Sequence, residues 1–468
     1  MDLSRRAFVS SALRASGTVL LASQLGRSST RAAGAHAPAA LPDPETSGID
    51  HVVVVMMENR SFDHFLGWLP NADGRQDGLS YRDPQGGAHP TYHQTQLNGC
   101  GFSDPDHSYD GGRTQYNGGK MDGFLADAAN DSYAVSYYRA ADRPFMSSLA
   151  LAYTTCDRYF CSILGPTYPN RFYQHAAQTD RLDNTMALSS LPTIWDQLNR
   201  PGGPSGRYYF SDVPFLALWG AKYLGISAPY AQFLADAATG ALPNVSFVDP
   251  RFEDEGSGTS GDDHPLADIR AGDAFLSEIF HALASGPAWG RTVLVVNYDE
   301  WGGFYEHVAP PRVTAAVPIG ASPASGPDKD LDAQGRALLG FRVPCIVASP
   351  FSRGSAARPR VAHARFDHTS VLKMIEWRWG LAPLTQRDAS PLAGDPGNLA
   401  TVLDLATPRP EVPALPVLGP FVSAGCPATL PGRGTPSVGL PGGAPVAPGG
   451  DRDTWTQLAA AARAAGWA

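Results

Sequence analysis

Basic side chains are few in this 468-residue sequence, and acidic ones outnumber them. Lys and Arg number 36 against 45 Asp and Glu, which gives a formal net charge of -9. Nucleic-acid-binding proteins need clustered Lys and Arg to neutralise phosphates, so this balance argues against a nucleic acid partner and leaves only a local basic pocket open. Beyond the N-terminal segment, the sequence also lacks any apolar run near the roughly 18 residues of a membrane span, so we expect a soluble mature protein.

Cysteine pairs at C-x-x-C spacing are absent as well, which argues against a zinc knuckle or a thioredoxin-type site. The sequence has five cysteines, at Cys100, Cys156, Cys161, Cys345 and Cys426. An odd number leaves at least one unpaired within a monomer. Cys156 and Cys161 are close enough in sequence to form a short-loop bridge in an oxidising compartment, and buried free thiols are the equal alternative.

Apolar residues, in contrast, are plentiful. They make up 43% of the chain and aromatic residues 10%, enough to offset chain entropy by burial, which predicts a globular protein. The 49 Gly and 41 Pro exceed ordinary usage and predict long loops around the regular elements.

Short apolar, β-branched runs alternate with helical patterns along the chain. Continuous runs of this kind are typical of strands covered on both faces, as in a parallel sheet. The predicted strands are His51–Met57, Val245–Val248, Thr292–Tyr298 and Val343–Ser349. The predicted helices are Ser189–Asn199, Ala267–Ala284 and Thr369–Trp379. This alternation predicts an α/β fold with a mostly parallel central sheet sandwiched by helices.

Composition divides the chain into segments. A globular domain is expected over residues 48–406, with long irregular insertions at 67–122 and 253–263. Residues 407–450 contain 11 Pro and 9 Gly, too many for regular structure, and predict a tail or linker. Residues 451–468 then have the pattern of a C-terminal helix.

The N-terminus carries the pattern of an export signal. Arg5 and Arg6 precede Phe8, a weakly apolar stretch follows, and an A-x-A string ends at Ala37. This arrangement resembles a twin-arginine signal peptide over residues 1–37, and an ordinary basic amphipathic helix is the alternative. We therefore expect a periplasmic or secreted protein. Because the twin-arginine route carries folded proteins, a metal could be loaded before export.

Two acidic strings follow two of the predicted strands. Glu58 and Asn59 come after the first, and Asp299 and Glu300 come after the third. Ligands of doubly wound sheets bind beyond the carboxyl ends of strands, where carboxylate and amide oxygens suit a hard cation. Adjacent buried acids would repel each other without a cation or basic partner, so the second string favours a metal site. For the first string, a capped helix N-terminus is an equal alternative.

A third string, GPTYPNR, places Thr167 just before a predicted helix, Phe172–Gln178. A hydroxyl at a helix N-terminus lies where backbone N–H groups and the helix dipole favour a phosphate, which makes Thr167 a candidate nucleophile. A plain N-cap is the alternative. Four loop histidines, His107, His264, His307 and His368, are candidate proton donors or positive partners of an anionic transition state, although a lone histidine is more often structural.

Together these strings resemble a bacterial phosphoesterase family that contains non-specific phospholipases C and a branch of acid phosphatases, related to the alkaline phosphatase superfamily. The resemblance spans about residues 48–383, and its strings occur in the family's order. They are MMENRSFDHFLG, DPDHSY with GKMDGF, GPTYPNRFY, DDHP, YDEWGGFYEHV and DHTSVLKMIEWRWG. The resemblance implies an alkaline-phosphatase-like core with long loop insertions.

The resemblance also implies site roles. It makes five residues ligands of an active-site metal: Glu58, Asn59, Thr167, Asp299 and Glu300. It makes Thr167 the nucleophile as well, and it places His107 and His264 beside the phosphoryl group as donors to its oxygens or as acid for the leaving alcohol. His307 and His368 match family strings without a firm role.

These parts predict one reaction. A divalent cation lowers the pKa of the Thr167 hydroxyl, which attacks phosphorus in line to give a phosphothreonine that water then hydrolyses. An all-oxygen ligand set favours Ca²⁺, Mg²⁺ or Mn²⁺, and the superfamily likeness leaves Zn²⁺ open.

The resemblance leads us to expect a secreted phosphoric ester hydrolase of the phospholipase C type. Its substrate would be a phospholipid or small phosphate ester, met in transient contact with a membrane surface. A broad-specificity acid phosphatase on the same scaffold is the nearest alternative. A non-catalytic, metal-stabilised envelope binding protein is the alternative from another class, and a sulfatase is disfavoured because the C-x-P-S-R string is absent.

Overall fold

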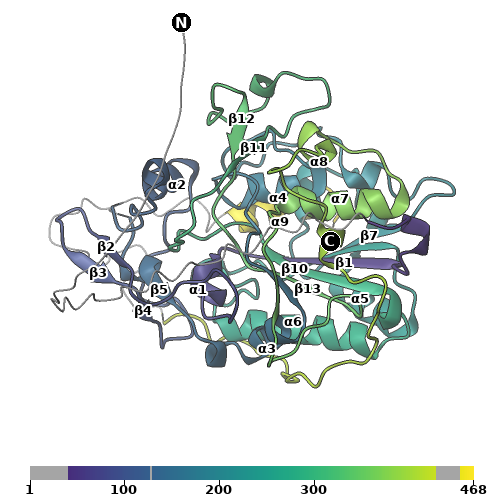
Figure 1. The fold of residues 1–468 in the computed structure, drawn as a ribbon, viewed down its shortest axis with the longest axis horizontal. Coiled ribbons are helices and arrows are strands. Elements are labelled where there is room, and N and C mark those ends of the chain that lie inside the picture. The colour runs from purple at the N-terminus through teal and green to yellow at the C-terminus, as the bar shows by residue number, and fades with distance from the viewer. Residues whose placement is uncertain (1–40, 127–128, 428–453, 468) are drawn as a thin grey trace, which may run out of the picture. The chain divides into compact units, whose positions relative to one another are not determined.

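A large mixed β-sheet forms the centre of this computed structural model, which describes residues 41–126, 129–427 and 454–467 (Figure 1). The eight strands run in the order β14-β6-β13-β10-β1-β9-β7-β8. In chain order they are β1 (His51–Met57), β6 (Thr154–Cys156), β7 (Gly206–Phe210), β8 (Ser227–Pro229), β9 (Val245–Asp249), β10 (Thr292–Tyr298), β13 (Cys345–Ala348) and β14 (Arg360–Ala362).

Most neighbouring strands are parallel, as the sequence predicts. The exceptions are β13 against β10 and β13 against β6, which are antiparallel. Strand β1 lies between β10 and β9 and is parallel to both, and Met57 pairs with Tyr298 where β1 and β10 end. The residues that follow these two strands therefore emerge side by side at one edge of the sheet.

Helices cover both faces of the sheet, because each strand at the centre buries apolar side chains on both sides. In Figure 1 helices α4 and α7 lie on one side of the sheet, and α3, α5 and α6 lie on the other. The helices are α1 (Phe62–Leu66), α2 (Tyr109–Tyr116), α3 (Pro144–Ala152), α4 (Thr167–Ala176), α5 (Tyr230–Thr239), α6 (Ile269–Ser285), α7 (His368–Trp379), α8 (Gln386–Ala389) and α9 (Thr454–Ala464). The predicted α/β class is confirmed.

The predicted helix over Ser189–Asn199 is wrong. The structure has only one 3-10 turn there, Ile194–Asp196, since the Asp196 carboxylate accepts the Thr193 N–H at 3.0 Å. A side chain that bonds the backbone locally competes with helix formation in this way. Elsewhere α6 and α7 match their predicted ranges within two residues, and α4 begins at Thr167, five residues before its predicted start.

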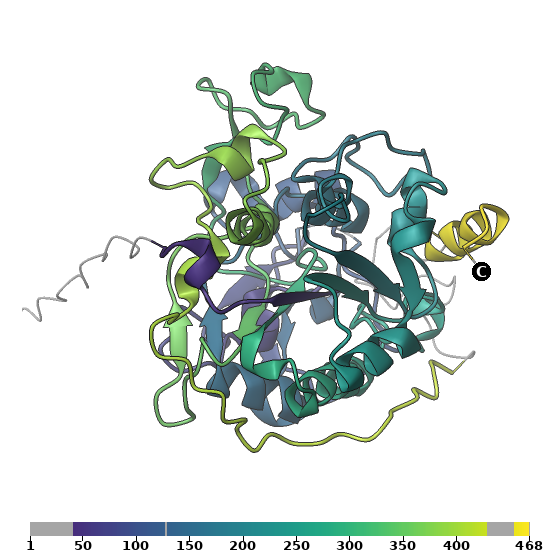
Figure 2. The same cartoon turned by 90° about the vertical axis from the view of Figure 1, so that its right-hand side faces the viewer.

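Long segments with little regular structure surround the sheet. The segment 67–126 contains α2 and the short strands β2 (Ser80–Arg82), β3 (Ala88–Pro90) and β4 (Tyr92–His93), with β2 paired to β3 and β4 paired to β5 (Ser136–Tyr137). A further ribbon joins β11 (Arg312–Thr314) to β12 (Arg336–Leu338). Helix α9, yellow in Figure 2, packs against the 3-10 helix η6 (Phe215–Trp219).

One disulfide joins Cys100 to Cys426, and the other three cysteines, Cys156 and Cys161 included, are free and buried. Residues 407–427 form no helix or strand. The expected signal segment 1–37 and most of the expected linker lie outside the described residues, so the domain boundaries stay predictions. Among the described residues, none of the helices has the length and apolar character needed to cross a membrane.

Candidate active site

The two acidic strings meet at the carboxyl ends of β1 and β10. Backbone hydrogen bonds continue past the strands, from Asp299 N to Met57 O at 3.1 Å and from Arg60 N to Glu300 O at 3.0 Å. Glu58 and Asp299 are fully buried. The sheet register thus brings together the two strings that the sequence placed after separate strands.

Asn59 connects these strings. Its backbone has a φ of 59°, in the left-handed region that asparagine tolerates better than most residues. In this conformation its N–H donates to Asp299 Oδ1 at 3.0 Å. Gly302 approaches from the second string so closely that a Cβ there would lie 2.0 Å from Asn59 O. The glycine is therefore required by the close approach of the two strand ends.

Thr167 is the first residue of α4, and Pro166 occupies the N-cap position. Its hydroxyl donates to Asn59 Oδ1 at 3.3 Å. The Asn59 amide lies 3.2 Å from His107 Nε2, and His107 Nδ1 lies 2.8 Å from Pro105 O. Since the carbonyl can only accept, Nδ1 carries the proton and Nε2 accepts from the amide. Three predicted site residues thus form one chain, Thr167 to Asn59 to His107.

His264 lies beside His107, with the ring centroids 5.9 Å apart. Its backbone N–H donates to Asp262 Oδ1 at 2.9 Å, which fixes the loop. Its Nε2 lies 3.7 Å from Glu255 Oε2 and 3.8 Å from Asp104 Oδ2. An imidazole flanked by two carboxylates is well placed to hold a proton for a leaving group.

Arg171 supplies positive charge to the acidic strand ends. It lies one helical turn after Thr167 on α4, so both side chains share a helix face. Its guanidinium lies 3.0 Å from Glu58 Oε1, 3.4 Å from Asp299 Oδ2 and 3.4 Å from Asp249 Oδ1. All these groups are buried, so the charges interact more strongly than they would in water.

Burial dominates the titration of these carboxyls. It raises the pKa of Glu58 well above its usual value against the opposing charge of Arg171, with Asp299 and Asp262 adding to the rise. It raises the pKa of Asp299 to about 6 and that of Asp262 to about 7. Carboxyls with such raised pKa values are typical of sites that bind a cation or move a proton.

The oxygen donors of the predicted metal site fit a hard cation. Asp299 Oδ2 accepts no hydrogen bond in the described part of the chain, and Asn59 Oδ1 and the Thr167 hydroxyl lie beside each other. Carboxylate, amide and hydroxyl oxygens are the ligands that Ca²⁺, Mg²⁺ and Mn²⁺ prefer.

The tightest groups of ligand atoms are nevertheless different ones. Among the described residues, three groups have ligand atoms within 4.8 Å of one another, and Glu58, Asp299 and Glu300 do not form such a group. The three groups are Glu58 with Glu255 and Asp262, Asp104 with His107 and His264, and Asp63 with Glu306 and His307.

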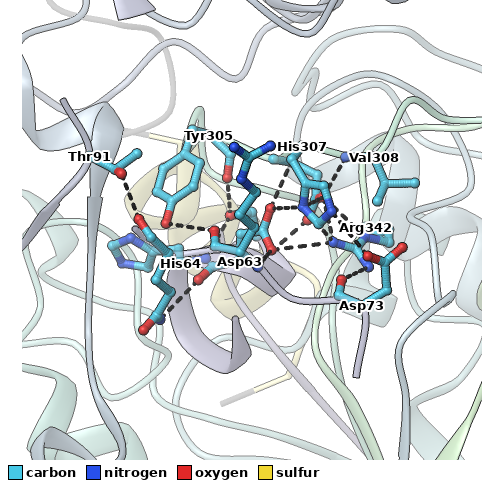
Figure 3. Close-up of polar contacts among 12 residues, drawn as sticks. Asp63, His64, Asp73, Thr91, Tyr305, His307, Val308 and Arg342 are labelled. Carbon is cyan, nitrogen blue, oxygen red and sulfur yellow. Dashed lines mark hydrogen bonds and ion pairs between the residues drawn. The ribbon is translucent and has the colours of Figure 1, made fainter. Parts of the chain in front are cut away.

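The third group is a separate network, shown in Figure 3. Arg342 is fully buried there and donates to Glu306 Oε1 at 2.6 Å, and His307 Nδ1 bonds Asp63 Oδ2 at 2.6 Å. The two bases therefore compensate the charges of Asp63 and Glu306, and His307 Nε2 also lies 3.2 Å from Asp73 Oδ1. The network connects α1 to the segment after β10, so His307 has a structural role here.

His368 also has a structural role. Its Nε2 donates to Asp299 O at 2.7 Å and its Nδ1 accepts from the Tyr159 hydroxyl at 3.1 Å. Burial lowers the pKa of His368 to about 4, which keeps the ring neutral. The hydrogen bond from His368 therefore helps to fix the backbone at Asp299.

Some residues of the site were not identified from the sequence. The pairing of Arg171 with Glu58 and Asp299 could have been sought in the GPTYPNR string, because positions four apart share a helix face. Asp104 and Asp262 each lie within a string that also contains a predicted histidine. Glu255 had no such signal, since it comes from an irregular segment whose path only the fold determines.

Comparison with known proteins gives a consistent result. The model of the "Phosphoesterase family" matches residues 49–209 and 195–382. "Non-specific phospholipase C1" of Arabidopsis thaliana is 33% identical over 374 residues, covering 73% of this chain and 69% of that protein. "Phospholipase C B" of Mycobacterium tuberculosis (strain ATCC 25618 / H37Rv) is 33% identical over 439 residues, covering 78% of this chain and 80% of that protein.

Solved structures are similar only at a distance. A protein of the alkaline phosphatase superfamily from Vibrio parahaemolyticus is 11% identical with a TM-score of 0.34, covering 74% of this chain and 71% of that one. The phosphonate monoester hydrolase of Agrobacterium radiobacter is 11% identical with a TM-score of 0.35, covering 76% and 77%.

Proposed function

Because this chain belongs to the phosphoesterase family and is a hydrolase of phosphoric esters, we propose that it cleaves phospholipids or related phosphodiesters as a phospholipase C, with Thr167 as nucleophile. The observation that carries the proposal is the direction of the Thr167 hydroxyl. It belongs to the first residue of α4, and it donates to the Asn59 amide oxygen at the junction of the two acidic strand ends.

The residues divide the reaction between them. Thr167 Oγ1 loses its proton to solvent as it attacks phosphorus, the bond from phosphorus to the alcohol breaks, and the phosphoryl group is carried as a phosphothreonine. Water then attacks phosphorus and gives a proton to His264, and the released Thr167 oxygen takes up a proton again. His264, held between Glu255 and Asp104, protonates the leaving alcohol. His107, oriented through Pro105 O and the Asn59 amide, borders the phosphoryl oxygens. The N-terminus of α4 faces the same group with its positive dipole end.

We assign a divalent cation to the oxygens of the five predicted ligands, Glu58, Asn59, Thr167, Asp299 and Glu300. When bound, it would stabilise negative charge on the phosphoryl oxygens and lower the pKa of the Thr167 hydroxyl. Ca²⁺, Mg²⁺ and Mn²⁺ suit these donors, with Zn²⁺ the alternative. Elemental analysis before and after a chelator, with activity assayed at each stage and after adding back each metal, tests this assignment. Full activity in verified metal-free protein would contradict it.

The charge around the site favours diesters over monoesters. A monoester carries one more negative charge than a diester and needs more cationic contacts. Arg171 is already engaged by Glu58, Asp299 and Asp249, so its charge is not available to a second phosphoryl charge. We expect faster turnover of p-nitrophenylphosphorylcholine than of p-nitrophenyl phosphate at equal concentration. The reverse preference would support the acid phosphatase alternative.

The test of the nucleophile compares Thr167→Val with Thr167→Ser. Valine keeps the β-branched shape without the hydroxyl, so turnover should fall by several orders of magnitude while the protein stays folded. Serine keeps the attacking oxygen and should retain a measurable rate. A folded, metal-loaded Thr167→Val protein with near wild-type turnover would favour direct attack by water.

We also propose export by the twin-arginine route, which suits a phospholipid substrate outside the cytoplasm. The Arg5–Arg6 string supports it, and so does the Cys100–Cys426 disulfide, since such bonds persist in oxidising compartments. Replacing both arginines with lysine should leave precursor in the cytoplasm of the native host. Cell fractionation and immunoblotting locate the variant. Normal export would contradict the twin-arginine route.

A further inference from the structure

Helix α9 lies outside the part of the chain that matches the family model, which ends at residue 382, yet it packs beside the active site. Trp455 in its first turn is 3% exposed. The indole stacks on Phe252 with the ring centroids 3.9 Å apart and the planes 2° from parallel. It also meets the Tyr168 ring edge-on at 5.2 Å.

Both ring partners of Trp455 lie next to residues of the proposed active site. Tyr168 follows Thr167 in α4, so the indole lies against the first turn of the helix that carries the nucleophile. The Phe252 ring lies 4.5 Å from the guanidinium carbon of Arg171, and the Trp455 ring lies 5.6 Å from it. These two aromatic rings therefore form an apolar wall beside Arg171, at the distances of cation–π contacts.

The apolar wall adds to the polar contacts of Arg171. Its polar partners are Glu58, Asp299 and Asp249, together with the backbone oxygen of Met56 at 3.2 Å. The side chain is only 2% exposed, so these ion pairs form where water does not screen them. Removing the indole would open this side of the guanidinium to water, weaken the pairs and give Arg171 room to move.

Movement of Arg171 would also shift Thr167, the proposed nucleophile. Thr167 and Arg171 are four residues apart on α4, and Arg171 joins that helix to the ends of β1 and β10 through Glu58 and Asp299. We propose that Trp455 is a positioning residue of the hydrolysis. By packing on Phe252 and Tyr168 it holds Arg171 against the two strand ends and so keeps the Thr167 hydroxyl on the Asn59 amide. This inference rests on the proposed role of Thr167.

The far end of the C-terminal segment provides matched controls. Trp467 is 4% exposed, and its Nε1 donates to Gly220 O at 3.0 Å. Leu458 is buried on the same face of α9. The ring contacts of Trp467 are with Phe210. Substitutions at Trp467 and Leu458 thus perturb the docking of α9 without removing the wall beside Arg171.

The experiment compares four full-length variants: Trp455→Ala, Trp455→Phe, Leu458→Ala and Trp467→Ala. Each is assayed on p-nitrophenylphosphorylcholine for kcat and KM, and hydrogen exchange of the α9 amides reports whether the helix remains docked. Trp455→Ala should lower kcat at least tenfold with KM changed less than threefold, and Trp455→Phe should restore most of kcat because a stacked ring remains. The two controls should keep kcat within threefold of wild type while α9 stays protected. A control that undocks α9 should lose kcat as Trp455→Ala does.

Three results would overturn the proposal. The first is a wild-type kcat in Trp455→Ala. The second is a raised kcat, which would make α9 a cover that hinders the substrate. The third is an equal loss in Trp455→Ala and a control whose α9 is still protected. Thr167→Val assayed in parallel separates this test from the proposed function: if that variant keeps its turnover, the nucleophile is wrong, whatever the Trp455 variants do.

Discussion

Asn59 joins more of the site than any single acid does. Its N–H bonds Asp299, its Oδ1 accepts the Thr167 hydroxyl, and its Nδ2 bonds His107. The left-handed backbone at this residue makes all three contacts compatible, since an extended backbone would turn the amide away from Thr167. The site therefore depends on one residue for both its backbone turn and its polar connections.

Two substitutions separate these roles. Asn59→Gly keeps the left-handed backbone without strain and deletes the amide that contacts Thr167 and His107, so turnover should fall about 100-fold, the effect typical of losing one preorganised polar group of an active site. Asn59→Ala should lose the same activity and a further ~1 kcal/mol in unfolding free energy, because a Cβ disfavours this φ. Steady-state kinetics and urea unfolding measure the two effects. Wild-type turnover in Asn59→Gly would remove the amide from the mechanism.

His307 gives a pH prediction outside the catalytic group. Burial lowers the pKa of His307, but the hydrogen bond to Asp63 and its charge raise it more, so the net shift is upward. A pKa above that of the unfolded chain, about 6.5, means that the protonated ring stabilises the fold fully below that pH. This stabilisation is lost as the pH rises through the folded pKa.

The loss of unfolding free energy in His307→Gln should therefore be larger at pH 5.5 than at pH 8.5. At the lower pH it should be about 1–3 kcal/mol, the contribution of a hydrogen bond to a charged group. Urea denaturation of wild type and variant at the two pH values measures this difference. An equal loss at both would show that the ring contributes by packing and not by charge.

The sequence predicted the strings that meet at the candidate site better than it predicted the residues packed around them. The strings around Glu58, Thr167, His107 and His264 could be identified because each places a reactive group at a strand end, a helix start or a loop. The roles of Glu255 and Trp455 could not be identified in that way. Each reaches the site through tertiary packing between segments far apart in the chain, which no local pattern encodes.

At the scale of elements, β1 and β10 were predictable and the helix over Ser189–Asn199 was not. Six consecutive apolar residues in β1 and five consecutive apolar or β-branched residues in β10 leave few alternatives to a buried strand. The 189–199 segment has helical periodicity, but Pro192 and the bond from Asp196 to Thr193 favour a single turn. Periodicity alone therefore predicts burial at this segment better than conformation.

The junction of the two strands predicts a strong requirement for glycine at position 302. Gly302→Ala should cost about 2–4 kcal/mol of unfolding free energy, since its φ of 64° and the close Asn59 O both disfavour a methyl group. Activity should fall with it. Gly290→Ala is the matched control, because a Cβ there meets nothing within 4 Å. Equal stability of the two variants in urea would contradict the close approach.

At the scale of the whole molecule, the disulfide connects two segments that are far apart in the sequence. It joins residues 326 apart and connects the segment before His107 to the irregular segment that precedes α9. A thiol assay in denaturant without reductant should therefore detect three of the five cysteines. Cys100→Ser with Cys426→Ser should lower the unfolding free energy by about 2–5 kcal/mol. Five reactive thiols in the untreated protein would contradict the bond.

The central claim of this account is that hydrolysis proceeds through a phosphothreonine at Thr167. The most direct measurement is the stereochemistry at phosphorus, using a chiral phosphorothioate diester cleaved in ¹⁸O-labelled water. Attack by Thr167 followed by attack of water gives two in-line displacements, so the account predicts net retention of configuration. Net inversion would show a single displacement by water and would contradict the covalent mechanism.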